Sequence, residues 1–296
     1  MRGASNSKKI WRVIYPPLLY FAIQIMVQVV FSIVLMGIFQ ANHNYESYGS
    51  LEAYSEASVS FIYQYAIAST LVSALISIPI LAGFFRGDNR RRFEETGCTY
   101  GKMKPVNFIL VAILGAACSG GFNKLISILA ACLPASYIES FQKVAEALNT
   151  GNIWTQVIAT AIVVPIAEEL VFRGLVYQRL KDIVSTKAAM IVSGLIFGIA
   201  HGNFIQGVYA FILGIFLSWI YEKCKTIWAP IVFHMMANGF SQLLEHWNVF
   251  QSASTGFMIL LMIIELTITF LICRIINKTV KIEKNEEVKK EDEYIW

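Results

Sequence analysis

Four polar side chains in apolar surroundings give this sequence its most specific chemical signal: Glu168, His201, His234 and Asn238. Ionisable groups inside a bilayer are costly, so they are usually functional or paired. A carboxylate can act as a general base toward water, and an imidazole can hold that water or shuttle its proton. A second imidazole and a side-chain amide can donate hydrogen bonds to an oxyanion. The set therefore predicts peptide-bond hydrolysis without a serine or cysteine nucleophile.

Helical spacing decides which of these groups share a face. His234 and Asn238 are four residues apart, so one helix face carries both. Glu169 and Arg173 have the same spacing, so they can form an ion pair along one helix. Contact with the substrate is an equally open alternative for these two residues. Glu168 lies about 100° from Glu169 around the helix axis, so it needs another partner. Three separate helices are expected to turn polar faces toward one bundle interior.

A structural alternative exists for every polar group within an apolar segment, because such groups also hold membrane helices together. For Lys124 and Glu265 we favour this alternative: a contact within the bundle, or snorkelling of the lysine stem. For Phe197 and His201, four residues apart, the ring can pack beneath the imidazole.

The elements that position these residues are apolar helices. The chain has 56% apolar and 15% charged residues, whereas a soluble domain has about 25% charged residues. Eight stretches meet or approach the roughly 20 residues that a helix needs to cross a bilayer. They are Ile14–Phe39, Val59–Phe85, Asn107–Leu133, Ile153–Tyr177, Ala188–His201, Gln206–Tyr221, Ile227–Leu244 and Gly256–Cys273. We therefore predict an all-α membrane protein with one domain over residues 1–296, a bundle of about eight transmembrane helices.

Loop charges predict the orientation, because Lys and Arg mark cytoplasmic loops. The basic N-terminus, the arginine-rich segment 86–104 and the charged tail 278–296 are expected inside, so both termini are cytoplasmic. The acidic segment with Glu46, Glu52 and Glu56 is expected outside. This pattern suits a multi-pass protein of a bacterial plasma membrane.

Several segments are not expected to span the bilayer. Gly202-Asn203 predicts a turn between the fifth and sixth helices. Pro134–Thr150 predicts an amphipathic helix at the outer surface, and Glu283–Glu293 a solvated tail. The five cysteines include no CxxC pair, so neither a disulfide framework nor a cysteine zinc site is implied. No nucleic-acid partner is expected, because Lys and Arg fall mostly in the gaps between apolar runs.

Three motifs, EExxxR, FxxxH and HxxxN, occur in order on separate predicted helices: Glu168-Glu169-Leu-Val-Phe-Arg173, Phe197-Gly-Ile-Ala-His201 and His234-Met-Met-Ala-Asn238. Together they resemble the CPBP family of intramembrane proteases. That family includes the CAAX prenyl endopeptidases and bacterial members linked to bacteriocin immunity and peptide processing. The resemblance covers residues 153–244, the motif-bearing core, and it implies a bundle of about eight helices.

The resemblance also implies a role for each motif residue. Glu168 would activate water together with His201, and His234 with Asn238 would stabilise the oxyanion. A supporting role falls to three neighbours: Glu169, Arg173 and Phe197. No cofactor is required in this scheme. The family has also been called metalloprotease, and Zn²⁺ is the alternative, with Glu168, His201 and His234 as ligands; the sequence has no HExxH motif.

The leading function is an endopeptidase that acts on a peptide or membrane protein within the lipid bilayer. Prenylated substrates are not expected in a bacterial membrane, so a peptide-maturation or immunity substrate is favoured. One alternative is a non-enzymatic bacteriocin-immunity or regulatory protein that binds a peptide. A transporter with a proton relay is less favoured, since no internal repeat is visible. The sequence leaves the oligomeric state open.

Overall fold

The computed structural model describes residues 5–96, 103–130, 132–148, 152–247, 249 and 253–280. Every regular element in these ranges is a helix, so the all-α prediction is confirmed. The amino-terminal elements are α1 (Asn6–Asn42), the 3₁₀ turn η1 (Tyr45–Tyr48), α2 (Leu51–Tyr63), α3 (Ala66–Thr96), α4 (Pro105–Ala130) and α5 (Ala135–Leu148). One continuous helix follows, made of α6 (Ile153–Gln156), η2 (Val157–Val163), α7 (Val164–Glu169), η3 (Leu170–Tyr177) and α8 (Gln178–Leu180). The remaining helices are α9 (Thr186–Ala200), α10 (Phe204–Cys224), α11 (Trp228–His246) and α12 (Thr255–Thr279).

Six helices in the described ranges are long and apolar enough to cross a membrane. They are α1, α3, α4, the continuous helix Ile153–Leu180, α10 and α12. The fifth predicted span, α9, is a shorter apolar helix of 15 residues, and α11 is not among the six. A count of eight membrane crossings, and the cytoplasmic placement of both termini, therefore stay predictions.

The second predicted span is wrong as drawn, because the stretch Val59–Phe85 is not one helix. α2 ends at Tyr63 and α3 begins at Ala66. At the break, the backbone N–H of Tyr65 bonds to the carbonyl of Ile62 instead of continuing the helix. The break lets α2 fold back onto α1, where Phe39 packs against Phe61 at 5.6 Å between ring centroids. Hydropathy along the chain does not reveal such a contact.

The predicted connecting segments are largely helical. Glu52 and Glu56 lie on α2, and Arg90 lies on α3, which continues to Thr96. α5 confirms the helix predicted over Pro134–Thr150, and its half-buried residues Ile138 and Phe141 alternate with exposed ones. The predicted tail Glu283–Glu293 lies outside the described residues.

The predicted turn between the fifth and sixth helices is confirmed. Gly202 has a φ of 67°, a left-handed conformation that glycine adopts without a steric cost. The side chain of Asn203 then caps α10 by accepting hydrogen bonds from the backbone of Ile205 at 3.0 Å and Gln206 at 3.2 Å. The same side chain donates to Ser140 of α5 at 2.9 Å, which ties the turn to the surface helix.

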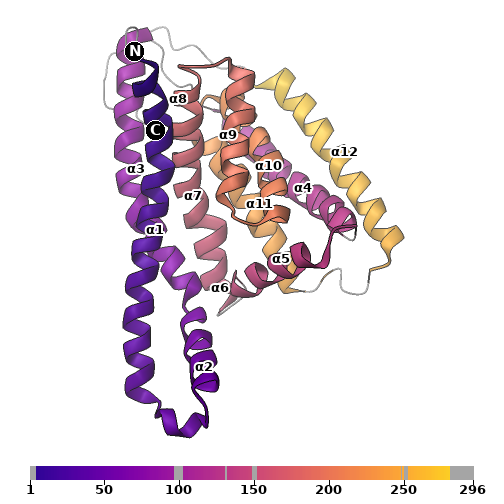
Figure 1. Cartoon of the computed structure of the whole chain (residues 1–296). Coiled ribbons are helices and arrows are strands. Elements are labelled where there is room, and N and C mark those ends of the chain that lie inside the picture. Colours follow the sequence, from indigo (N-terminus) through magenta and orange to yellow (C-terminus); the bar gives the residue numbers. More distant parts are fainter. Residues whose placement is uncertain are drawn as a thin grey trace.

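The helix Ile153–Leu180 occupies the middle of the molecule, with α1 and α3 on one side and α9 to α11 on the other (Figure 1). α4 packs against α11 and α12. A buried ion pair joins α4 to α12, with Lys124 Nζ at 2.7 Å from Glu265 Oε2. This pair is the bundle contact that the sequence favoured.

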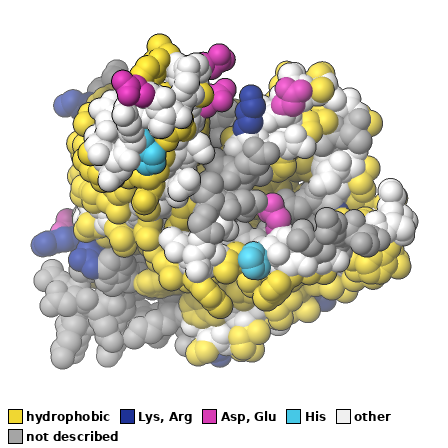
Figure 2. All heavy atoms as spheres, turned by 90° about the horizontal axis from the view of Figure 1, so that it is seen from below, with side chains coloured by type: hydrophobic (Ala, Val, Ile, Leu, Met, Phe, Trp, Pro, Cys, Tyr) yellow, Lys and Arg dark blue, Asp and Glu magenta, His cyan; other side chains and the backbone are white. Residues whose placement is uncertain are grey.

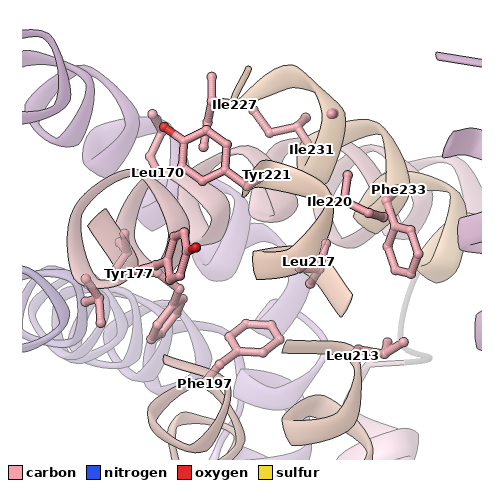
Figure 3. Packing of buried hydrophobic residues seen from close by; sticks show 14 of the residues in the cluster. Leu170, Tyr177, Phe197, Leu213, Leu217, Ile220, Tyr221, Ile227, Ile231 and Phe233 are labelled. Atoms are coloured by element: carbon pink, nitrogen blue, oxygen red, sulfur yellow. The ribbon is translucent and has the colours of Figure 1, made fainter. Parts of the chain in front are cut away.

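Buried apolar side chains from several of these helices meet around the middle helix. Figure 3 shows Tyr177 beside Tyr221 and Phe197 below them. The Tyr177 and Tyr221 rings lie 6.2 Å apart between centroids, and both side chains are buried. Ile231 and Phe233 of α11 belong to the same cluster, so this packing fixes the helices that carry the three motifs relative to one another.

Candidate active site

The first motif lies on a helix with two wide turns. α7 carries Glu168 and Glu169, and π-helical segments precede and follow it. Pro165 lies in the first turn of α7 and lacks the backbone N–H that an α-helical bond would need. Wide turns of this kind are frequent at functional sites. Motif reading did not predict them, although Pro165 was a visible signal.

Glu169 joins two of the three motifs through one oxygen atom. Its Oε1 accepts from Arg173 Nη1 at 2.8 Å, so the predicted ion pair along the helix is confirmed. The same oxygen lies 2.8 Å from Nδ1 of His234 on α11. Because a carboxylate accepts, Nδ1 carries the proton in this contact. Glu169 and Arg173 are completely buried, so the carboxylate holds the motif helix and α11 together in a dry environment.

Glu168 has a different environment from its neighbour. Its side chain is 17% exposed, whereas that of Glu169 is 0% exposed. The partner that the spacing required is His234, whose Nε2 lies 3.7 Å from Glu168 Oε2. With the proton on Nδ1, the neutral ring offers Nε2 only as an acceptor, and it donates there only when doubly protonated.

Phe197 brings the second motif to the same place. His201 packs edge-on against its ring at 4.7 Å between centroids, as the spacing predicted. His234 lies against the same ring at 5.8 Å, and the Arg173 guanidinium lies 4.2 Å above it. The Nδ1 atom of His201 bonds to the Phe197 carbonyl at 2.8 Å, which leaves Nε2 as the acceptor of the neutral ring.

Asn238 lies on α11 with His234, as predicted, and is held by the first wide turn. Its Nδ2 donates to the carbonyl of Thr160 at 2.9 Å. Gln242, one helical turn further along α11, donates to the Thr160 hydroxyl. Thr160 and Gln242 were not predicted, because neither belongs to a motif.

A further unpredicted neighbour comes from α1. Tyr20 is 1% exposed and interacts electrostatically with Glu168. Nothing in the local sequence marks this tyrosine, since it lies almost 150 residues before the first motif.

The structure thus brings Glu168, Glu169 and His234 together directly, and places His201 and His234 on one aromatic ring. Within the part of the chain that the structure describes, no three His, Cys, Asp or Glu side chains converge as a metal site. The alternative zinc set therefore does not form a ligand cluster in this arrangement.

Comparison with known proteins points to the same part of the chain. Residues 150–240 match the family model described as type II CAAX prenyl endopeptidase Rce1-like. This region is similar to the CPBP family of membrane proteases. The matched residues contain all three motifs on the helices described above.

Two bacterial relatives are more than 30% identical over about a third of this chain. A Bacillus subtilis (strain 168) protein named "Putative membrane peptidase YdiL" is 32% identical over 89 residues, which cover 30% of this chain and 36% of that protein. The "Membrane-embedded CAAX protease MroQ" of Staphylococcus aureus (strain USA300) is 34% identical over 94 residues, which cover 30% of this chain and 38% of that protein. The chain therefore matches little more than a third of each relative. No solved structure matches.

A third relative, the "UPF0177 protein YxdF" of Lactococcus lactis subsp. lactis (strain IL1403), is 26% identical over 106 residues, which cover 36% of this chain and 58% of that protein. The six membrane-length apolar helices and the bacterial membrane relatives identify the chain as a multi-pass bacterial membrane protein.

Proposed function

We propose that this protein is an intramembrane endopeptidase that hydrolyses a peptide bond in a membrane-associated peptide or protein. The observation that carries the proposal is a pair of contacts made by His234 inside the Rce1-like region. Its Nδ1 lies 2.8 Å from Glu169 Oε1, and its Nε2 lies 3.7 Å from Glu168 Oε2. It pairs one buried carboxylate, engaged through Oε1, with one partly exposed carboxylate, and an imidazole lies between them.

In this proposal Glu168 is the general base. Glu169 is engaged by Arg173 and His234, whereas Glu168 is the more accessible carboxylate and can meet a water. His201 presents Nε2 as an acceptor and helps to hold the same water. The water loses a proton to Glu168 as its oxygen bonds to the peptide carbonyl carbon, and the carbonyl electron pair moves onto the carbonyl oxygen. When this oxyanion collapses, the C–N bond breaks and Glu168 returns the proton to the leaving amine.

His234 and Asn238 are the proposed oxyanion donors. Asn238 uses one N–H on Thr160 and has a second one to offer. His234 donates from Nε2 in its doubly protonated form, since Nδ1 is directed at Glu169. Fixed donors of this kind stabilise the charge that develops in the transition state.

The proposed substrate is a peptide or protein segment that reaches the bilayer interior. The family model is described as a CAAX prenyl endopeptidase, and the Staphylococcus aureus relative is named a CAAX protease. We propose a peptide-maturation or immunity substrate for this bacterial chain, because prenylated proteins are not expected in that membrane.

The proposal is tested by Glu168→Gln, which keeps the side-chain shape and removes the base. Peptides are compared by mass spectrometry in cells that carry the wild type or the variant, and candidate peptides are then incubated with purified protein. Loss of a general base is expected to slow cleavage about 10²- to 10⁴-fold. The matched control is Glu94→Gln, an exposed glutamate on α3, which should cleave normally.

If Glu168→Gln and His234→Ala both keep the full biological effect, the chain acts by binding a peptide and the enzyme proposal fails. Uptake or efflux of a solute by the protein in liposomes would instead favour transport.

The proposed mechanism needs no metal. Purified protein is therefore expected to keep its activity after dialysis against a chelator. Stoichiometric zinc that is lost from His201→Ala together with the activity would overturn this part of the proposal.

A further inference from the structure

An open pocket lies between α1, α2 and α3, outside the region that matches the Rce1-like family. Its volume is about 260 Å³. Apolar and aromatic side chains dominate its lining: Phe31, Leu35, Val59, Ile62, Tyr63 and Tyr65.

The break between α2 and α3 creates this pocket. Tyr63 is the last residue of α2 and Tyr65 lies in the break. Both line the pocket, so the bend between the two helices forms one of its walls. The opposite wall is one face of α1, where Gln28, Ser32 and Leu35 recur at helical spacing. The packing of Phe39 against Phe61 holds the two walls together beyond the pocket.

The charges around the pocket have one sign. Residues 13–85 contain no Lys or Arg, and their only charged residues are Glu46, Glu52 and Glu56. All three glutamates are exposed, and in the described ranges no ion pair neutralises any of them. In Figure 2, which views the molecule from below, acidic side chains gather at the upper left, on the side where α1 and α2 project.

The acidic side chains lead to the pocket along one face of α2. Glu52, Glu56, Val59 and Tyr63 are spaced by four, three and four residues, so they form one stripe on the helix. The last two members of the stripe line the pocket. A ligand that binds the glutamates therefore has an apolar pocket directly next to its charged group.

The pocket also lies at a useful distance from the candidate active site. Tyr20 of α1 interacts electrostatically with Glu168, so its position along α1 serves as the reference point for the candidate active site. Gln28 and Leu35 lie about 12 Å and about 22 Å further along α1, at a rise of 1.5 Å per residue. An extended peptide covers that distance in about four to seven residues.

We propose that the pocket is a docking site for a cationic segment of the peptide substrate. Lys or Arg side chains of the substrate would lie on Glu52 and Glu56, and an adjacent aliphatic side chain would fill the pocket between α1 and α2. The site selects substrates whose aliphatic anchor lies about four to seven residues from the bond that is cut, with the basic segment next to that anchor. The inference rests on the proposed function for its role in cleavage, whereas the binding itself does not depend on hydrolysis.

The test measures binding of a fluorescent peptide with two lysines and a leucine to full-length protein in nanodiscs of phosphatidylcholine, a zwitterionic lipid. All proteins carry Glu168→Gln so that no peptide is cut during the measurement. We expect Glu52→Gln/Glu56→Gln to weaken binding about 2- to 30-fold, with a smaller loss at high salt, because exposed ion pairs are weak and screened. Val59→Trp, which fills the mouth of the pocket, should weaken binding at every salt concentration.

The matched control is Glu139→Gln on α5, which removes one exposed glutamate from another helix. A second control is the same peptide with its lysines replaced by glutamines, for which the double variant and the parent should bind alike. Equal binding of the lysine peptide to the parent and the double variant would overturn the proposal. An equal loss in Glu139→Gln would do the same, since it would show a general surface effect.

Other occupants of the pocket give different results. If lipid fills it, Val59→Trp leaves peptide binding unchanged, and if a second copy covers it, the double variant dissociates a dimer; either result overturns the proposal. Cleavage is measured with protein that keeps Glu168. If this protein binds the lysine peptide but cuts no peptide, the proposed function is rejected and the docking site is retained. Equal cleavage of the lysine and glutamine peptides would reject the docking site alone.

Discussion

Glu169 shows how much one buried residue can organise. A single carboxylate oxygen receives Arg173 from its own helix and His234 from α11, both at 2.8 Å. All three side chains are at most 5% exposed, so water contributes little to their solvation. Removal of one partner from a buried pair leaves the other charge uncompensated, which costs far more than the loss of an exposed pair.

The chain offers a matched comparison for this effect. Glu169→Gln is expected to lower the free energy of unfolding by about 3–5 kcal/mol, because the Arg173 charge stays buried without its counter-ion. Glu94→Gln breaks an exposed pair with Arg90 at the same helical spacing and should cost less than about 1 kcal/mol. Thermal or denaturant unfolding of the detergent-solubilised proteins measures both. Similar losses in the two variants would show that the buried pair has no special structural role.

Close approach of α4 and α11 sets the position of the third motif. A Cβ atom on Gly115 of α4 would lie 2.3 Å from the carbonyl oxygen of Phe233, the residue before His234. Four residues further along α4, Ser119 donates to the carbonyl of Ala237 at 2.9 Å, next to Asn238. Small residues allow such close contacts between membrane helices. The spacing of these two helices therefore controls the geometry of both proposed oxyanion donors.

Gly115→Ala is expected to push α11 away from α4 and to lower both stability and activity, with an overpacking cost of about 1–3 kcal/mol. Gly37→Ala on α1 is the control, since a Cβ there meets nothing within 4 Å. That control should be neutral or more stable by up to about 1 kcal/mol. Thermal unfolding and peptide cleavage by both variants measure the difference. The interpretation of the α4–α11 contact would be wrong if Gly115→Ala matched Gly37→Ala in both assays.

The whole molecule combines a motif-bearing bundle with an extension made by α1, η1 and α2 (Figure 1). The extension carries the acidic stripe and the pocket, whereas arginines near the start of α1, near the end of α3 and on α8 pair with Asp88. This separation of charge agrees with the predicted orientation, in which basic segments stay in the cytoplasm.

The orientation is tested by single cysteines in a background without the native ones. Ser47→Cys lies in the exposed turn η1, and Arg90→Cys lies on the exposed face of α3. A membrane-impermeant maleimide should label Ser47→Cys in intact cells and Arg90→Cys only after permeabilisation. The reverse pattern would place the docking site in the cytoplasm and overturn the topology.

The spacing of residues in the sequence was sufficient to predict contacts that form within about one helix turn. The Glu169–Arg173 pair, the packing of His201 on Phe197 and the Gly202-Asn203 turn all follow from residues at most four positions apart. Periodicity and hydropathy are local quantities, so the sequence by itself determined the all-α membrane class, the motif helices and these short-range contacts.

Only the tertiary structure decided which groups meet across the bundle. The contact of His234 with Glu169 joins residues 65 positions apart, and that of Asn238 with Thr160 joins residues 78 positions apart. The break between α2 and α3 likewise depends on packing of α2 against α1, which no apolar run reveals. Contacts of this kind come from the packing of whole helices, and the sequence near each residue does not encode them.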